Sequence, residues 1–230
     1  MHSPAAAALR ATLPVLFGYV PLGIAFGLLF NTLGYPWYFA PLMGIFIFAG
    51  AAQFLAVGLL SAHAGLLEVA VTTFLLNSRH MFFGLSLLGR FRIPGLRRLY
   101  LIFGLTDETY SLLTGTKPPE GVKRADYDLW VTGLNQLWWV TGCTVGALLG
   151  QAVAFDLTGL DFTLTALFMV LVIEQYRATR AWLPFLVALA CGLLALALFD
   201  HRHMLLLAIA LATSLLIADG KRRQWTTPST

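Results

Sequence analysis

Four consecutive polar side chains, Asn77, Ser78, Arg79 and His80, stand near the middle of an apolar run at residues 66–88. A charged side chain at the centre of a bilayer costs roughly 2.5–3.5 kcal/mol on insertion scales, and such residues usually face a cavity or a transport route. A helix broken at Asn77-Ser78 would expose N–H groups that can hold a carboxylate, and Arg79 can bind the same anion with two hydrogen bonds. His80 belongs to the residue type that changes charge near neutral pH, so it can carry a proton.

Two adjacent carboxyl groups, Asp107 and Glu108, lie in the middle of another apolar run, residues 99–113. Neighbouring residues point about 100° apart on a helix, so the two acids should meet different partners. We expect one to pair with Arg79 and the other to carry a proton or bind an ammonium group. Gln53, in the run 39–60, offers a donor and an acceptor beside small residues that let another backbone approach. The alternative for each of these residues is a purely structural hydrogen bond or ion pair.

The composition shows which elements must position these side chains. Hydrophobic residues make up 58% of the chain and charged residues 11%, whereas soluble domains carry about 25% charged residues. Several apolar runs reach the roughly 20 residues that a spanning helix needs, and the shorter ones can be tilted, broken or re-entrant. The sequence predicts an all-α polytopic membrane protein, a single domain over residues 1–230, with seven or eight membrane segments, some of them broken. The runs are 11–30, 39–60, 66–88, 99–113, 129–154, 160–173, 181–199 and 204–218.

Basic residues and tryptophans give the expected orientation. Loops on the inner face of a membrane carry an excess of lysine and arginine, and tryptophans gather at the interfaces. Eight crossings with both termini inside place most basic residues, including Arg124, on the inner face, but leave one basic loop outside. That loop contains Arg90, Arg92, Arg97 and Arg98. Trp138 and Trp139 are expected to belong to an interfacial belt.

The two halves of the chain, about 12–114 and 130–218, resemble each other and predict an internal repeat. Gly23–Leu29 aligns with Gly142–Leu148 through two glycines spaced four apart, although close helix packing can produce that spacing independently. Transporters are often built from two repeats with the solute held between them. Whether these repeats are parallel or inverted stays open. The second-half counterparts of the polar residues are Gln175, near the position of Gln53, and Arg202 and His203, which repeat Arg79-His80.

Catalytic and metal-binding motifs are not found in this sequence. Cys143 and Cys191 lie in apolar runs without metal-ligand spacing. The hydrolase, zinc-protease and phosphate-loop patterns are missing, and Ser78 beside His80 resembles a nucleophile–base pair only superficially. The net charge of +4 indicates nothing specific about nucleic acid. We therefore expect no metal, no cofactor, no nucleic-acid partner and no enzyme activity.

Four motifs occur in order along the first half: Gly18–Gly27, Phe48–Phe54, Asn77–His80 and Thr106–Glu108. Together they resemble the AzlC family, the large subunits of bacterial branched-chain amino acid exporters. The resemblance implies a multi-pass permease of the bacterial inner membrane that exports leucine, isoleucine, valine and sometimes methionine. It also implies a small membrane subunit of the AzlD type as partner.

The residues and the resemblance together favour a proton-coupled secondary transporter in contact with membrane lipid. The alternatives are a non-transporting membrane scaffold or regulatory subunit whose buried ions are structural, and an intramembrane enzyme that uses Ser78 or His80. The proton would be handled by His80, Asp107 and Glu108. The residues expected to bind the amino acid are Gln53, Asn77, Ser78, Arg79, Asp107 and Glu108.

Overall fold

The computed structural model describes residues 3–87, 89–91, 93–152, 169, 172–173, 176–177, 180–198 and 204–226. The regular structure of these ranges is helical, which confirms the all-α prediction. The chain divides into two compact units, each described by itself: Met1–His63 with Thr73–Thr165, and Ala64–Thr72 with Ala166–Thr230. The single domain and the repeat halves stay predictions.

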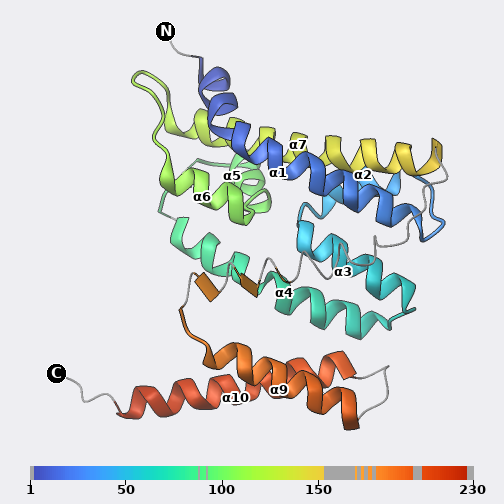
Figure 1. Ribbon diagram of the computed structural model, residues 1–230. Helices are drawn as coiled ribbons and strands as arrows, with labels where there is room; N and C mark the ends of the chain where they lie inside the picture. The colour runs from blue at the N-terminus through green and yellow to red at the C-terminus, as the bar shows by residue number, and fades with distance from the viewer. Residues whose placement is uncertain are drawn as a thin grey trace. The chain divides into compact units, whose positions relative to one another are not determined.

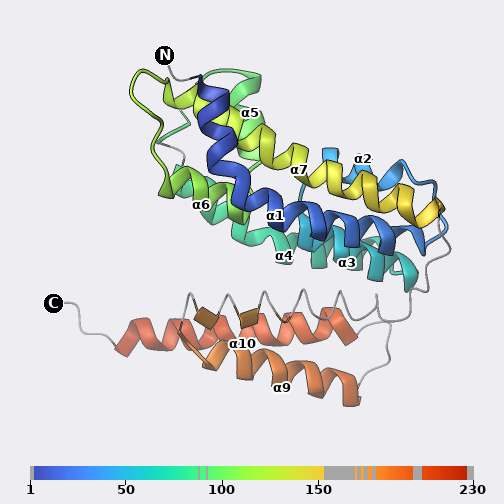
Figure 2. The same ribbon diagram turned by 45° about the horizontal axis from the view of Figure 1, so that its top comes forward.

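The first unit contains the helices that carry the described candidate binding residues. Helix α4 belongs to this unit from Thr73 onward. The second unit contains α9 (Leu183–Leu198) and α10 (Met204–Thr226), which pack against each other and run antiparallel (Figures 1 and 2). The helices of the first unit are α1 (Pro4–Asn31), α2 (Phe39–Phe46), α3 (Gly50–Ser61), α4 (Leu66–Leu87), α5 (Leu96–Phe103), α6 (Asp107–Gly115) and α7 (Arg124–Ala152).

Helices α1 and α7 lie side by side and run parallel (Figure 1), and α2, α3, α5 and α6 pack against one or both of them. Helix α1 begins at Pro4, directly after the extended residue Ser3, and a proline in the first turn loses no intrahelical hydrogen bond. Pro14 and Pro21 lie inside the helix, where each removes a backbone donor. The helix accordingly changes direction along its length (Figure 2).

Two pairs of glycines let α1 and α7 touch backbone to backbone. A Cβ atom built on Gly23 would lie 2.9 Å from the Cα of Gly142, and one built on Gly142 would lie 2.6 Å from the carbonyl oxygen of Val20. Gly27 and Gly146 are packed in the same way one turn later. Larger side chains would separate the helices, as in other glycine-spaced contacts. The segments that the predicted repeat aligns are thus in contact with each other, while the repeat itself stays a prediction.

The apolar run 39–60 folds into a helical hairpin, α2–α3, on α7. Helix α2 starts near the end of α1, where the rings of Tyr35 and Phe39 lie 6.3 Å apart. It runs back to the middle of α7, where the carbonyl oxygen of Ile45 accepts a hydrogen bond from Gln136. The chain then turns through Phe48, whose φ of 42° is rare for an aromatic residue. Helix α3 returns along α1, and Phe54 packs on Phe26 with ring centroids 5.6 Å apart.

The run 99–113 forms a second hairpin, α5–α6, which enters from the opposite end of α7. Leu101 of α5 lies in a core with Ala8 and Leu113, near the start of α1 and α7. The break follows at Gly104, where any Cβ would collide with the methyl group of Thr132. Helix α6 then runs back toward the start of α7. The two hairpin tips meet, because a Cβ on Gly104 would lie 3.8 Å from Cε1 of Phe48.

Helix α4 is continuous from Leu66 to Leu87, so the predicted break at Asn77-Ser78 is wrong. The breaks lie instead at residues 47–49 and 104–106. Ser78 stays in the helix because its hydroxyl donates to the carbonyl oxygen of Leu75 at 2.7 Å, which is the usual way a serine is accommodated in a helix interior.

Apolar side chains cover the outside of these helices, and polar ones lie inside. Phe17 of α1 is 74% exposed and Phe46 of α2 is 72% exposed, whereas Gln53 and Asn135 are fully buried. A water-soluble monomer rarely shows this distribution. Of the helices that the structure describes, α1 alone has the length and composition to cross a membrane, so the number of crossings stays a prediction.

Candidate functional site

Buried polar side chains from four helices gather where the two hairpin tips meet, and we call them the tip cluster. Helix α7 contributes two of them, four residues apart and therefore on one face. All except Glu108 are buried. The members are Tyr19 of α1, Gln53 of α3, Thr106, Glu108 and Thr109 at the start of α6, and Asn135 and Trp139 of α7.

A chain of hydrogen bonds runs from exposed Glu108 to buried Asn135. The hydroxyl of Tyr19 donates to Oε2 of Glu108 at 2.6 Å and lies 2.7 Å from Oγ1 of Thr106. The Thr106 hydroxyl donates to Oγ1 of Thr109 at 3.0 Å, and the same oxygen accepts a bond from Nδ2 of Asn135 at 3.0 Å. The exposed carboxylate is thereby connected through hydroxyl groups to the interior.

Trp139 fixes the amide of Gln53. Its indole Nε1 donates to Oε1 of Gln53 at 2.8 Å, and its ring meets Tyr19 edge-on at 5.5 Å. The indole is a donor only, so the Gln53 oxygen must face it and the amide nitrogen must point elsewhere. Trp139 is 3% exposed, and the expectation that it belongs to an interfacial belt is wrong for this residue.

Two atoms of the tip cluster have no hydrogen-bond partner among the described residues: Nε2 of Gln53 and Oδ1 of Asn135. Both residues are completely buried. A buried polar atom left without a partner costs about 1–3 kcal/mol, so native proteins rarely keep such atoms without a reason. One of these atoms is a donor and the other is an acceptor.

The hairpin tips also differ in how their second helices begin. The N-cap of α6 is Thr106, whose side chain accepts a hydrogen bond from the backbone N–H of Thr109. The N-cap of α3 is Ala49, which has no side chain able to do so. The first N–H groups of α3 therefore lack a capping side chain at the place where Gln53 lies.

A separate ionic cluster holds the other end of α6. Asp128 is buried and accepts two hydrogen bonds from Arg90, at 2.9 and 2.6 Å. Arg90 and Arg124 both donate to the carbonyl oxygen of Leu113. Cations are favourable at a helix C-terminus, and each charge in this cluster has a partner. We read it as structural, and the expected placement of Arg90 on the opposite face from Arg124 is wrong.

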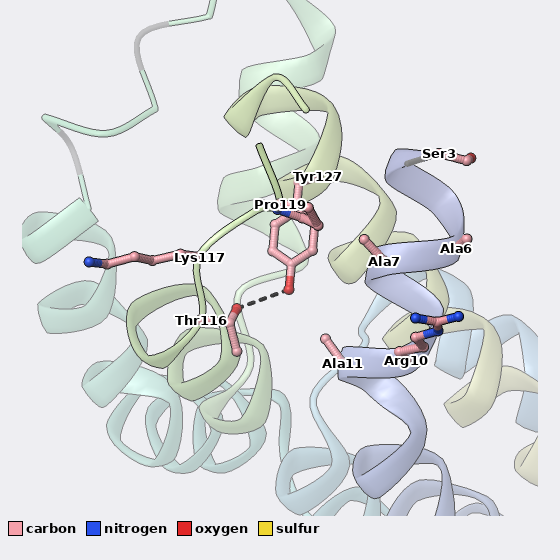
Figure 3. Close-up of a pocket in the computed structure, with 9 residues that line it drawn as sticks. All are labelled: Ser3, Ala6, Ala7, Arg10, Ala11, Thr116, Lys117, Pro119 and Tyr127. Atoms are coloured by element: carbon pink, nitrogen blue, oxygen red, sulfur yellow. Dashed lines mark hydrogen bonds between the residues drawn. The ribbon is translucent and has the colours of Figure 1, made fainter. Parts of the chain in front are cut away.

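A hollow of about 460 Å³ lies between the first turns of α1 and the α6–α7 loop. Figure 3 shows Arg10 and Lys117 on its rim, with their charged ends pointing away from the hydrogen bond between Thr116 and Tyr127. No charged groups converge in this hollow, and four of its nine lining residues are alanine or proline. It does not resemble a specific site for a charged solute.

Ser78 and His80 of α4 each contact a carbonyl oxygen three residues earlier in the same helix. Nδ1 of His80 lies 3.2 Å from the carbonyl oxygen of Asn77, and the His80 ring meets Phe83 edge-on. Asn77 and Ser78 are half-buried. Arg79 lies in the helix, but its side chain is outside the described part, so its expected pairing with an acid stays a prediction.

Of the predicted binding residues, the structure brings Gln53 and Glu108 into the tip cluster. Asp107 is half-buried on the first turn of α6. The counterparts Gln175, Arg202 and His203 lie outside the described residues. The sequence reasoning missed five members, although the spacing of Asn135, Trp139 and Gly142 on one helical face was a readable signal. These five are Tyr19, Thr106, Thr109, Asn135 and Trp139.

Comparison with known proteins identifies the family. The model of the AzlC protein family matches residues 14–153, more than half of the chain. The chain belongs to the AzlC family. The Bacillus subtilis branched-chain amino acid transport protein AzlC is 35% identical over 198 residues, which cover 86% of this chain and 78% of that protein. No solved structure matches.

Two further relatives place the family in membranes. An uncharacterized membrane protein of Helicobacter pylori is 40% identical over 92% of both chains. The Escherichia coli inner membrane protein YgaZ is 30% identical over 75% of this chain and 73% of its own length. The chain is therefore a membrane protein of a transport family, which points away from an enzyme.

Proposed function

We propose that this chain is a secondary transporter that exports branched-chain amino acids across the bacterial inner membrane, driven by protons, together with a small membrane subunit. The AzlC relative of Bacillus subtilis, named for branched-chain amino acid transport, supports the substrate class. The observation that carries the proposal is the tip cluster, where a buried donor and a buried acceptor have no partner within the described ranges, at the meeting point of the two helical hairpins. Transporters hold solutes at such breaks because free backbone groups there are shielded from lipid.

The distribution of basic residues supports an orientation for the first unit. In this proposal α1, the one described helix with the length and composition to cross a membrane, spans it together with the more polar α4 and α7, while the two hairpins enter from opposite faces and return. The basic residues then lie at the cytoplasmic end, in agreement with the positive-inside rule. This arrangement removes the exception created by eight crossings, in which one basic loop faced outward. The residues at this end are Arg10, Arg90, Arg97, Arg98, Lys117 and Arg124.

Glu108 is the proton carrier in this proposal. Its carboxylate is exposed and accepts the Tyr19 hydroxyl, so a proton taken up there changes the hydrogen-bond chain that ends at Asn135. A neutral carboxyl group accepts the Tyr19 hydrogen bond more weakly than a carboxylate does, so protonation favours donation from Tyr19 to Thr106 instead. The solute site and the proton site are then coupled through three hydroxyl groups, with no need for a buried charge.

The test is transport of labelled leucine by purified chain in liposomes, with and without the small subunit. Glu108→Gln is neutral, like the protonated acid, and cannot take up or release a proton. We expect it to keep leucine counterflow and to lose uptake driven by an imposed pH gradient. Glu120→Gln, in the exposed loop before α7, is the matched control and should keep both.

Unchanged gradient-driven transport by Glu108→Gln would remove the proton assignment. No leucine flux in any preparation of the unaltered chain, with or without the subunit, would instead favour the scaffold alternative. Direction is decided separately, by whether cells that produce the chain lose preloaded leucine faster than cells that lack it.

A further inference from the structure

We propose that Gln53 and Asn135 recognise the zwitterionic head group of an α-amino acid, the carboxylate at Gln53 and the ammonium at Asn135. This inference rests on the proposed function and assigns the atoms that bind the substrate. No charged side chain is required for it, because a zwitterion needs one donor site and one acceptor site at short separation.

The carboxylate side is defined by Gln53. Trp139 holds the Gln53 oxygen, which leaves Nε2 as a donor without a partner among the described residues. Gln53 lies in the first turns of α3, whose helix start has no capping side chain. The free N–H groups and the positive end of the helix dipole add to the same donor site. The side chains of Ala51 and Ala52 are small, so they take up little space beside these backbone groups.

The ammonium side is defined by Asn135. Its nitrogen donates to Thr109, and Oδ1 is left as a buried acceptor. Asn135 and Trp139 are one helical turn apart on α7, and Trp139 holds Gln53, so the two unpaired amide atoms belong to neighbouring positions along one face of α7. The start of α6 next to Thr109 carries Asp107 and Glu108, whose charges disfavour a carboxylate and favour an ammonium group.

An apolar side chain suits the aromatic surroundings of Trp139, which holds the Gln53 amide. The ring of Phe26 stacks on Trp139 with centroids 6.4 Å apart and meets the ring of Phe54 edge-on at 5.6 Å. All three are buried. The chemical class is therefore an α-amino acid with free carboxylate and ammonium groups and no charge on its side chain.

The experiment compares leucine with two analogues, leucinol, which lacks the carboxylate, and 4-methylpentanoate, which lacks the ammonium. Each competes against labelled leucine in counterflow by the full chain in liposomes. Gln53→Glu keeps the oxygen that Trp139 binds but replaces the donor by an acceptor. We expect the ratio of leucine to leucinol affinity to fall at least about tenfold, because sites that lose a required partner discriminate strongly.

Asn135→Asp tests the other half independently. It adds negative charge at the ammonium position, so leucinol should bind more tightly relative to leucine and 4-methylpentanoate should no longer compete. Gln151→Glu, an exposed position at the end of α7, is the matched control and should leave all ratios unchanged. Should Gln53→Glu fail to fold in detergent, the Asn135→Asp ratios decide the proposal.

If a folded Gln53→Glu variant lost affinity for leucine and for leucinol by the same factor, the assignment would be overturned, while the proposed transport function would still stand. Unaltered ratios in Asn135→Asp would do the same. If the unaltered chain carries no leucine at all, the proposed function falls, and this inference falls with it.

Discussion

The two hairpins on α7 share a geometry but have opposite chemistry at their tips. In α2–α3 the second helix begins at Ala49-Gly50-Ala51-Ala52, with no cap and no charge. In α5–α6 it begins at Thr106-Asp107-Glu108-Thr109, with a hydroxyl cap and two acids. Both tips lie beside the same stretch of α7, so a solute between them meets an electropositive helix start on one side and an electronegative one on the other.

The ends of the hairpins differ too, and this difference shows what each hairpin depends on. Helix α6 is held at its C-terminus by Arg90 and Arg124, which both donate to Leu113 and are tied to Asp128. Helix α3 ends at Ser61, where the following N–H groups bond back to carbonyls of the last turn. The acidic tip is therefore anchored by ions, while the uncapped tip is positioned by Trp139, by aromatic packing and by the hydrogen bond from Gln136 to the carbonyl oxygen of Ile45.

The largest effect should come from removing the ionic anchor. Asp128→Ala leaves Arg90 half-buried without its carboxylate, and breaking such a pair typically destabilises by about 3–5 kcal/mol. Hydrogen exchange followed by mass spectrometry should show faster exchange in α5–α6 and little change in α2–α3. Glu120→Ala is the control. An equal increase of the exchange rate in both hairpins would contradict the inference that the two hairpins are anchored independently.

Gly104→Val should separate the tips with a somewhat smaller effect. The new side chain collides with Thr132, and overpacking of this kind usually costs about 1–3 kcal/mol. We expect a lower melting temperature in detergent and loss of leucine counterflow. Gly115→Val, where the space beside the glycine is open, should change neither. Full transport by Gly104→Val would show that contact between the tips is not needed.

The apolar runs predicted which segments are helical, but the sequence did not locate the breaks. At Thr106 a signal existed, since threonine followed by two acids is a typical helix start. At Phe48 none existed, because a positive φ at an aromatic residue is imposed by tertiary packing. The hypothesis of a break at Asn77-Ser78 rested on the polarity of these residues, yet a bond such as the one from Ser78 to Leu75 satisfies a polar group inside a continuous helix.

The candidate site could be predicted only in part for a similar reason. Gln53 and Glu108 were found because a polar residue in an apolar run is conspicuous. Tyr19 and Trp139 look like ordinary aromatic residues until their partners, which are 86 to 89 positions away, are known. The pairing of Arg90 with Asp128 likewise spans 38 positions. Single-sequence reasoning offers no way to find such contacts, whereas helical spacing would have grouped Asn135 with Trp139.

Ala49→Ser should make the uncapped tip resemble the capped one. The residue already has the extended backbone of an N-cap, so a serine hydroxyl can accept from the first N–H groups and stabilise α3 by about 1 kcal/mol. Those groups are then no longer free for a carboxylate. We expect a higher melting temperature together with leucine affinity reduced about tenfold, a difference of about 1.4 kcal/mol. Unchanged affinity in the stabilised variant would place the carboxylate elsewhere.

Thr106→Ala is the reverse exchange and should have the smallest effect on binding. It removes the cap of α6 and one partner of Tyr19, which should lower stability by about 1 kcal/mol. The newly free N–H groups should not attract the carboxylate, because Asp107 and Glu108 still dominate the field at this helix start. Leucine affinity should therefore change less than about threefold, with Thr114→Ala on the exposed side of α6 as control. A large gain in affinity would mean that capping, rather than charge, distinguishes the two tips, and the acids would then need a different role.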